Sequence, residues 1–339
     1  MWENGRQLHR IERGILLQIS DISVRPGRAI EGMSAVLLPF DEDGQIDFDG
    51  LAHNLSHTAR AGLTPAVNMD TGYTNLLQPA QRTQVLEATQ QTLGGAPFIA
   101  GAFIEGQDGD AQRLYHAAID EIHAHGGTPI LFQSSALKAL DDHKKLALFG
   151  SLAGECETLL AFELGEMFAP FGEIYALDFV GELMQIPQIK GIKHSSLNRE
   201  LEWQRLALRD RVRPGFKIYT GNDLAIDMVI YGSDYLLGLS AFCPEAFAAR
   251  DRLWQSGDTR FFELNDLLQY LGCLAFRAPV PAYKHNAAQF LKLRGHIASD
   301  SPHPDAVRRP DSDKEILADI SGRLDAMLEE IAATEKETP

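Results

Sequence analysis

The sequence predicts an α/β fold, namely a TIM (β/α)8 barrel followed by a C-terminal helical extension. Eight short apolar runs recur along the chain, and their spacing suits one strand–helix unit each. The runs are continuously apolar, as expected for strands that are buried on both faces of a parallel sheet. Eight units without an obvious ninth favour a closed barrel over an open doubly wound sheet. The predicted strands are Ser34–Phe40, Pro65–Met69, Phe98–Phe103, Pro129–Gln133, Thr158–Leu164, Ile189–Lys193, Phe216–Thr220 and Tyr235–Phe242.

Helical patterns fill the segments between these runs. The first helix places Leu51, Leu55 and Ala59 at helical spacing and ends before Gly62, a residue that commonly stops helices. After Pro244 the pattern is purely helical. The clearest predicted helices are Phe48–Ala61, Ala111–His125, Leu224–Tyr231, Glu245–Gln255, Arg260–Arg277, Val280–Leu293 and roughly Asp313–Ala332.

These patterns divide the chain into three parts. Residues 1–30 form an N-terminal extension that packs either across the barrel's floor or into a neighbouring subunit. Residues 31–245 form the barrel. Residues 246–339 form the last barrel helix and a C-terminal helical bundle.

The composition of the chain excludes several classes of binding partner. The formal net charge is −16, from 47 acidic and 31 basic residues, which argues against binding of nucleic acid or an anionic membrane. A small anionic substrate remains compatible with this net negative charge, because the attraction of one nearby cation at contact distance outweighs the diffuse repulsion from distant acidic residues. The three cysteines, Cys156, Cys243 and Cys273, suggest neither a disulfide framework nor a metal site, which fits a reducing cytoplasm. No membrane span is expected, and no cofactor is predicted, since phosphate-binding and dinucleotide fingerprints are missing from the sequence.

Lys193 is the candidate nucleophile, because it ends the sixth predicted strand. Residues at the carboxyl ends of barrel strands surround one mouth, where TIM-barrel catalysis occurs. Burial there favours the neutral amine, which can attack a carbonyl to form an imine. A lysine whose head merely reaches solvent is the alternative interpretation.

Histidines carry less weight. His53 and His57 lie four residues apart on one predicted helix, a spacing that suits a metal ion. That helix lies outside the barrel and lacks the glutamate of the HExxH motif, so we interpret both as surface histidines and predict no metal site.

Several short motifs then occur in the order and spacing of the dihydrodipicolinate synthase / N-acetylneuraminate lyase superfamily, and the chain resembles that superfamily over roughly residues 31–335. The resemblance implies a TIM barrel with a C-terminal helical domain, often assembled as a dimer or tetramer. It also implies class I aldolase chemistry, in which a lysine forms a Schiff base with a 2-oxo acid such as pyruvate. The motifs that carry it are Gly32–Phe40, Gly44–Asp47, Thr71-Gly72, Gly191-Ile192-Lys193, Gly221-Asn222-Asp223, Gly232–Pro244 and Arg309-Pro310.

The chain departs from that family's pattern at residues that normally handle protons. The family's tyrosine at the end of strand five is Phe162 here, and the loop after strand two carries Asp70 and Tyr73 in place of a threonine and a glutamate. The aromatic pair after strand four is missing, and Glu166-Met167-Phe168 offers no arginine for a second substrate's carboxylate. Dihydrodipicolinate synthase activity itself is therefore not expected.

We predict a Schiff-base lyase or aldolase acting on pyruvate, another 2-oxo acid or a sugar-acid derivative. Lys193 would be the nucleophile, and Asp70, with Glu163 as the other candidate, would carry protons. Thr71 and the amide of Gly72 would hold the substrate's carboxylate, although Asp70 and Asn222 could be only helix caps. The complete predicted substrate-binding set is Thr71, Gly72, Phe162, Glu163, Ser195, Gly221, Asn222 and Leu239.

Two alternatives remain open on the sequence. A non-catalytic or weakly active protein that binds a small acid would explain the missing tyrosine. A metal-dependent aldolase would need a cluster of His, Asp and Glu at the mouth.

Overall fold

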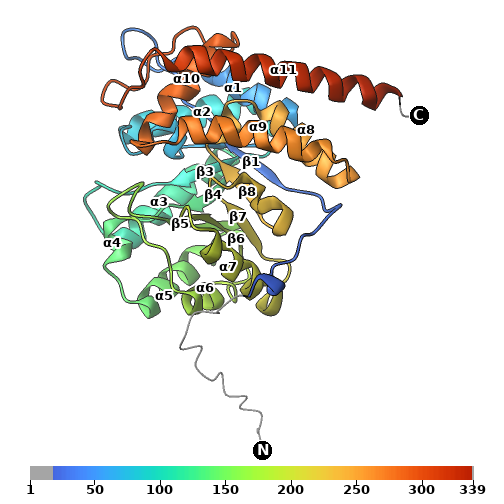
Figure 1. Cartoon of the computed structure of the whole chain (residues 1–339). Coiled ribbons are helices and arrows are strands. Elements are labelled where there is room, and N and C mark those ends of the chain that lie inside the picture. Colours follow the sequence, from blue (N-terminus) through green and yellow to red (C-terminus); the bar gives the residue numbers. More distant parts are fainter. Residues whose placement is uncertain (1–17, 338–339) are drawn as a thin grey trace, which may run out of the picture.

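The computed structural model describes residues 18–337. Eight parallel strands close into a barrel in sequence order, with β8 hydrogen-bonded to β1 (Figure 1). The predicted TIM-barrel fold is therefore confirmed. The strands are β1 Gly32–Ala35, β2 Thr64–Val67, β3 Ile99–Ala102, β4 Thr128–Leu131, β5 Leu159–Leu164, β6 Ile189–Ser195, β7 Lys217–Thr220 and β8 Asp234–Leu237.

Helices connect the strands and extend the chain beyond them. The α-helices are α1 Phe48–Ala61, α2 Pro79–Leu93, α3 Ala111–Ala124, α4 Ser135–Lys138, α5 Asp142–Ala153, α6 Leu177–Leu183, α7 Arg199–Val212, α8 Pro244–Ser256, α9 Arg260–Ala275, α10 Tyr283–Leu293 and α11 Asp313–Glu337. The 3-10 turns are η1 Ile19–Asp21, η2 Asp70–Gly72, η3 Ile226–Tyr231, η4 Leu239–Ala241 and η5 Val280–Ala282.

Local sequence signals explain where helices begin and end. Helix α1 has the predicted bounds, because the Asp47 carboxylate accepts a hydrogen bond from the Gly50 N–H and Gly62 adopts a left-handed conformation with φ 94°. The helix expected at 224–231 is instead the 3-10 turn η3, since the short connection between β7 and β8 leaves no room for a full helix. The helix expected at 280–293 likewise begins as a 3-10 turn.

Alternation along each strand separates two hydrophobic cores. In β5, Leu160, Phe162 and Leu164 point into the barrel, whereas Leu159 and Ala161 pack outward against the helices. In the register between β5 and β6, Phe162 on β5 is the direct neighbour of Lys193 on β6, and Glu163 is the neighbour of His194. The Lys193 side chain therefore lies inside the barrel, and that of Glu163 lies outside it.

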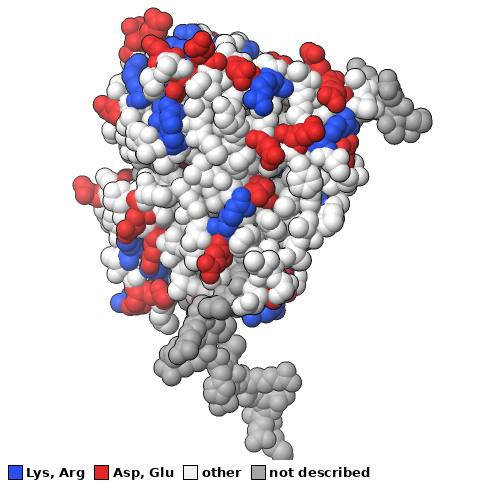
Figure 2. Space-filling view, viewed as in Figure 1, with Lys and Arg blue, Asp and Glu red and all other residues white. Residues whose placement is uncertain are grey.

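The C-terminal helices cover one end of the molecule. Helix α8 packs on α1 and α9, and α11 lies along α9 and α10 (Figure 1). The loops and turns after the strands meet these helices, so α9 and α10 close the carboxyl end of the barrel. Acidic and basic side chains are interspersed over the face seen in Figure 2.

The described part of the N-terminal extension runs past the opposite end of β8. The Arg25 N–H donates to the Ile230 carbonyl at 2.7 Å, and Trp254 Nε1 donates to the Arg25 carbonyl at 3.0 Å. Arg28 Nη1 donates to Asp234 Oδ1 at 3.0 Å, at the first residue of β8. The earlier part of the extension, residues 1–17, lies outside the described residues. Within residues 18–337, no helix combines the length and hydrophobicity needed to cross a bilayer.

Candidate active site

Lys193 faces a small cavity at the carboxyl end of the barrel. The cavity has a volume of about 20 Å³, enough for one or two water molecules. Aromatic rings of Phe168, from the β5–α6 loop, and Phe276, after α9, help to enclose it. A wider hollow of about 120 Å³ lies outside the barrel between α2 and α3, but none of the predicted site residues lines it. The predicted residues that line the cavity are Asp70, Thr71, Phe162, Lys193, Ser195 and Gly221.

The environment of Lys193 favours the neutral amine. Its side chain is buried, and burial lowers the pKa of Lys193 from 10.5 to about 8, although the charges of Asp223 and Asp70 oppose that shift. The Phe162 ring lies 4.5 Å from Nζ, centroid to nitrogen, and supplies an apolar wall with a π face. Near neutral pH an appreciable fraction of this lysine is therefore unprotonated and nucleophilic.

Two glycines make space for the reactive groups. A Cβ at Gly221 would lie 2.0 Å from Ser195 Oγ and 2.9 Å from Lys193 Cε, so any side chain there would collide with both. A Cβ at Gly238 would lie 3.1 Å from Thr71 Oγ1. The backbone after β7 and β8 can approach the cavity this closely only because both positions lack side chains.

Asp70 is held in a network of hydrogen bonds. Lys284 Nζ donates to Asp70 Oδ1 at 3.0 Å, and the Tyr283 hydroxyl donates to Oδ2 at 3.0 Å. The Tyr283 and Thr71 hydroxyl oxygens are 2.8 Å apart, so Thr71 can donate to Tyr283. Burial alone would raise the pKa of Asp70, but Lys284 and Tyr283 outweigh burial and lower it. Asp70 is therefore an ionised anchor for Tyr283 near neutral pH.

Asp223 is a second carboxyl group in the cavity. It was not among the site residues predicted from the sequence, although it belongs to the motif Gly221-Asn222-Asp223. Burial raises the pKa of Asp223 from 3.8 to about 7; the Leu239 N–H, which donates to Oδ1 at 2.7 Å, and the Lys193 charge oppose the rise. A carboxyl group that titrates near pH 7 can both give and take a proton there.

Glu163 does not line the cavity. Its carboxylate lies outside the barrel, where it accepts hydrogen bonds from Arg205 Nη2 at 2.8 Å and the Tyr175 N–H at 2.9 Å. His194 Nδ1 lies 2.6 Å from Glu163 Oε1. Burial would raise the pKa of Glu163, but Arg205 and His194 lower it to about 2. The structure therefore gives Glu163 a structural role where the sequence predicted substrate contact or proton transfer.

Three other predicted residues, Gly72, Asn222 and Leu239, do not line the cavity and make hydrogen bonds next to it. The Gly72 N–H donates to the Met69 carbonyl at 3.0 Å, so it is already paired within its own turn. Asn222 Oδ1 accepts from the Leu224 N–H at 3.1 Å within a turn. It does not cap a helix, because η3 begins at Ile226 with Ala225 as its N-cap. Leu239 contributes its backbone N–H to Asp223.

Tyr283 is the main addition to the predicted site. It comes from the start of α10, stacks on Phe276 with ring centroids 4.2 Å apart, and places its hydroxyl in the cavity. Burial and the Asp70 charge raise the pKa of Tyr283 well above 10, so the hydroxyl stays protonated. No motif in the sequence pointed to Tyr283, because a helix outside the eight strand–helix units supplies it.

The comparisons with known proteins agree with this architecture. A family model described as "Protein of unknown function (DUF993)" matches residues 37–299. A relative from Streptomyces coelicolor, described as probable 5-dehydro-4-deoxyglucarate dehydratase 2, is 29% identical over 274 residues, which cover 77% of this chain and 79% of the relative. A relative of the same description from Streptomyces avermitilis is 26% identical over 331 residues, or 91% of both chains.

Solved structures share the fold. YagE, a prophage protein of the dihydrodipicolinic acid synthase family from E. coli K12 in complex with pyruvate, has a TM-score of 0.74 at 16% identity and covers 87% of this chain and 98% of its own. Dihydrodipicolinate synthase from Thermotoga maritima has a TM-score of 0.74 at 15% identity and covers 88% and 99%. The resemblance to this superfamily is thus confirmed at the level of the fold.

Proposed function

The chain belongs to the DUF993 family, and we propose that it is a lyase whose Lys193 forms a Schiff base with a 2-oxo acid. One observation carries the proposal: a buried lysine, with its pKa lowered to about 8, faces a small cavity at the carboxyl end of a TIM barrel. Because the nucleophile is a side chain, the reaction requires no cofactor.

The first step joins the substrate to the chain. The neutral Lys193 amine attacks the ketone carbon, the carbonyl oxygen leaves as water, and a C=N bond forms. The protonated imine withdraws electrons from the neighbouring C–H bond, so a base can remove that proton to give an enamine. The enamine then expels a hydroxyl group from the following carbon as water. In aldol cleavage the base instead removes the proton of that hydroxyl group from the protonated imine, and the C–C bond breaks to release an aldehyde and leave the enamine.

We assign proton transfer to Asp223. Its pKa of about 7 suits a group that must accept the C–H proton and return one to the leaving oxygen. Asp70, which the sequence favoured for this task, is bound to Lys284 and has a lowered pKa. Asp70 instead orients Tyr283, whose hydroxyl faces the cavity beside that of Thr71. Ser195 would donate a hydrogen bond to the substrate's carboxylate, and Thr71 would join it by exchanging its hydrogen bond to Tyr283 for one to the substrate.

The substrate class follows from this cavity and from the relatives. Two relatives carry the description of a dehydratase for 5-dehydro-4-deoxyglucarate, a keto acid derived from a sugar acid. The hydroxyl groups of Thr71, Tyr283 and Ser195, whose oxygens can also accept hydrogen bonds, suit a polar substrate of that kind. We therefore favour a sugar-acid-derived keto acid over pyruvate alone, and dehydration over aldol cleavage.

The purely binding alternative loses its main support. It was motivated by Phe162, which has no hydroxyl, but Tyr283 and Asp223 bring a hydroxyl and a titratable carboxyl group to the same cavity. A metal-dependent aldolase also lacks support, because none of the residues that line the cavity is a histidine.

Location and assembly belong to the same proposal. Cys156, Cys243 and Cys273 are all free, which suits a reducing cytoplasm. Exposed Phe262 and Tyr270 on α9 supply apolar surface for a homo-oligomeric contact, either dimer or tetramer. Light scattering after size-exclusion chromatography measures that assembly.

Reductive trapping tests the chemistry. The protein is incubated with pyruvate and borohydride, and the modified peptide is located by mass spectrometry. We expect one adduct, at Lys193, which is lost in Lys193→Arg. Lys190→Arg is the matched control, since Lys190 is an exposed lysine on the same strand. The absence of an adduct, or an adduct at another lysine, would overturn the proposal; turnover of 5-dehydro-4-deoxyglucarate tests its finer part.

A further inference from the structure

We infer that His53, His57 and His296 form a binding site for a divalent transition metal ion, best matched by zinc, that joins helix α1 to the C-terminal helices. This site is separate from the Lys193 cavity, because none of its residues lines that cavity. It goes beyond the proposed lyase activity and does not depend on it.

The backbone brings three imidazoles together. His53 and His57 are four residues apart on α1, so both project from one face of the helix. After α10, Gly295 adopts a left-handed conformation with φ 75°, and the His296 N–H donates to the Leu291 carbonyl at 2.9 Å. This turn ends the helix and directs His296 back toward α1.

The distances suit a metal ion. One ring nitrogen from each histidine lies within 4.8 Å of the others, and His53 Nε2 is 2.9 Å from His296 Nδ1. A tetrahedral zinc ion with bonds of about 2.0–2.1 Å places its ligand nitrogens about 3.4 Å apart. Side-chain rotations that move the ring nitrogens by about 1 Å would therefore complete the ligand set, with a water molecule as the fourth ligand.

Nearby carboxylates complete the surroundings. Glu245 Oε2 lies 3.0 Å from His57 Nε2, the contact by which a carboxylate commonly orients a ligating histidine. Arg294 is close, but its charge is offset by Glu245 Oε1 at 3.0 Å and Asp325 Oδ1 at 2.8 Å. The metal ion would thus meet no net positive charge from these side chains.

The burial of the three rings also suits a ligand set. His57 and His296 are half-buried, whereas His53 is exposed and leaves a path from solvent.

Binding at this position would stabilise the fold. His296 is 243 residues from His53 in sequence, and the ion would tie the barrel's first helix to the end of α10. Because the folded chain offers the complete ligand set and the unfolded chain does not, metal binding shifts the folding equilibrium toward the native state.

The experiment uses the full-length chain without a polyhistidine tag, stripped of metal by a chelator. Zinc is titrated by calorimetry, and cobalt is titrated as a spectroscopic probe of coordination. We expect one equivalent to bind, a tetrahedral cobalt spectrum and a raised melting temperature. His296→Asn should weaken zinc binding at least about 100-fold, and Glu245→Gln about 10–100-fold.

His143→Asn is the matched control, because His143 is an exposed histidine outside the cluster. It should leave the zinc affinity unchanged. His53→Asn, a change at an exposed position, repeats the test if His296→Asn does not fold. Undetectable binding to the unmodified chain, or equal zinc affinity in His296→Asn, His53→Asn and the control, would overturn the inference.

Discussion

Phe162 and Lys193 are direct neighbours in the register of β5 and β6, and the lysine Nζ lies 4.5 Å from the centre of the phenylalanine ring. The ring acts on the lysine in two opposite ways. It excludes water, which favours the neutral amine, and it presents a π face that attracts the ammonium form. The pKa of about 8 reflects the balance of burial against the attraction of Asp223 and Asp70.

Replacing Phe162 with leucine should lower the pKa of Lys193 further. The leucine side chain still excludes water, but it lacks the π face, which is worth about 0.5–2 kcal/mol to a cation. We expect the pH midpoint of borohydride trapping to fall by about 0.4–1.5 units. An upward shift would mean that the ring acts on the lysine only by excluding water.

Replacing Asp223 with asparagine should separate imine formation from turnover. Loss of the proton carrier should lower kcat by about 10²–10⁴-fold, whereas trapping at Lys193 should persist. The pH midpoint of borohydride trapping should also fall in this variant, because the Asp223 charge raises the pKa of Lys193. Asp108→Asn, at an exposed loop position, is the control and should change neither quantity. Full activity in Asp223→Asn would return proton transfer to Asp70.

Replacing Tyr283 with phenylalanine removes one hydroxyl and keeps the stacking on Phe276. Asp70 and Thr71 lose their shared partner, so kcat/KM should fall by about 10–100-fold, the usual cost of losing a hydrogen bond to a charged group. Tyr270→Phe, on the exposed face of α9, should leave kcat/KM unchanged. Equal kinetics in the two variants would remove Tyr283 from the mechanism. Steady-state rates, with circular dichroism as a check of folding, provide the measurement.

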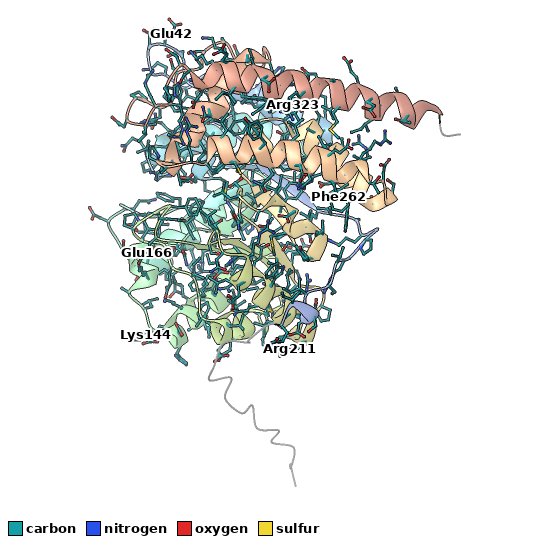
Figure 3. All side chains as sticks on the ribbon, in the orientation of Figure 1. Glu42, Lys144, Glu166, Arg211, Phe262 and Arg323 are labelled. Atoms are coloured by element: carbon teal, nitrogen blue, oxygen red, sulfur yellow. The ribbon has the colours of Figure 1, made fainter. Side chains whose placement is uncertain are left out.

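Replacing Glu163 with glutamine should destabilise the fold. Arg205 and His194 would stay buried outside the barrel without their carboxylate partner, which should lower the free energy of unfolding by about 3–5 kcal/mol. Glu166→Gln is the matched control: Glu166 pairs with Lys138 at the surface, and its removal should leave the urea midpoint unchanged (Figure 3). Equal midpoints in both variants would show that the buried network contributes little.

The same carboxylate gives a pH dependence of stability. The folded-state pKa of Glu163 lies at about 2, below its ordinary value of 4.5, so the folded chain binds that proton less readily than the unfolded chain. The contribution of Glu163 to the free energy of unfolding is therefore complete above pH 4.5 and is lost as the pH falls toward 2. Urea titrations across this window should show a steeper loss for the unmodified chain than for Glu163→Gln.

The fold and the position of Lys193 at a strand end were predictable from the sequence because they depend on local patterns. Apolar runs at regular spacing located the strands, and Lys193 stood at the end of one of them. The error at Glu163 has a clear physical cause. Adjacent residues in a strand face opposite sides, so Phe162 and Glu163 could not both enter the barrel.

Other parts of the site depend on contacts between distant segments. Tyr283 reaches the cavity from α10, and His296 joins His53 and His57 only through the turn at Gly295. No spacing rule within one strand–helix unit predicts such contacts between residues that are distant in sequence. Asp223 was visible in its motif, but its raised pKa follows from burial, which composition and pattern do not measure.

The small volume of the cavity that Phe168 and Phe276 line has a kinetic consequence. A keto acid needs more room than one or two water molecules, so side chains that line the cavity must move before substrate enters and again before product leaves. When such a rearrangement limits the rate, added sucrose or glycerol slows turnover through solvent viscosity. Exchange of phenylalanine for alanine at position 168 would then make turnover less sensitive to the viscosity of the medium.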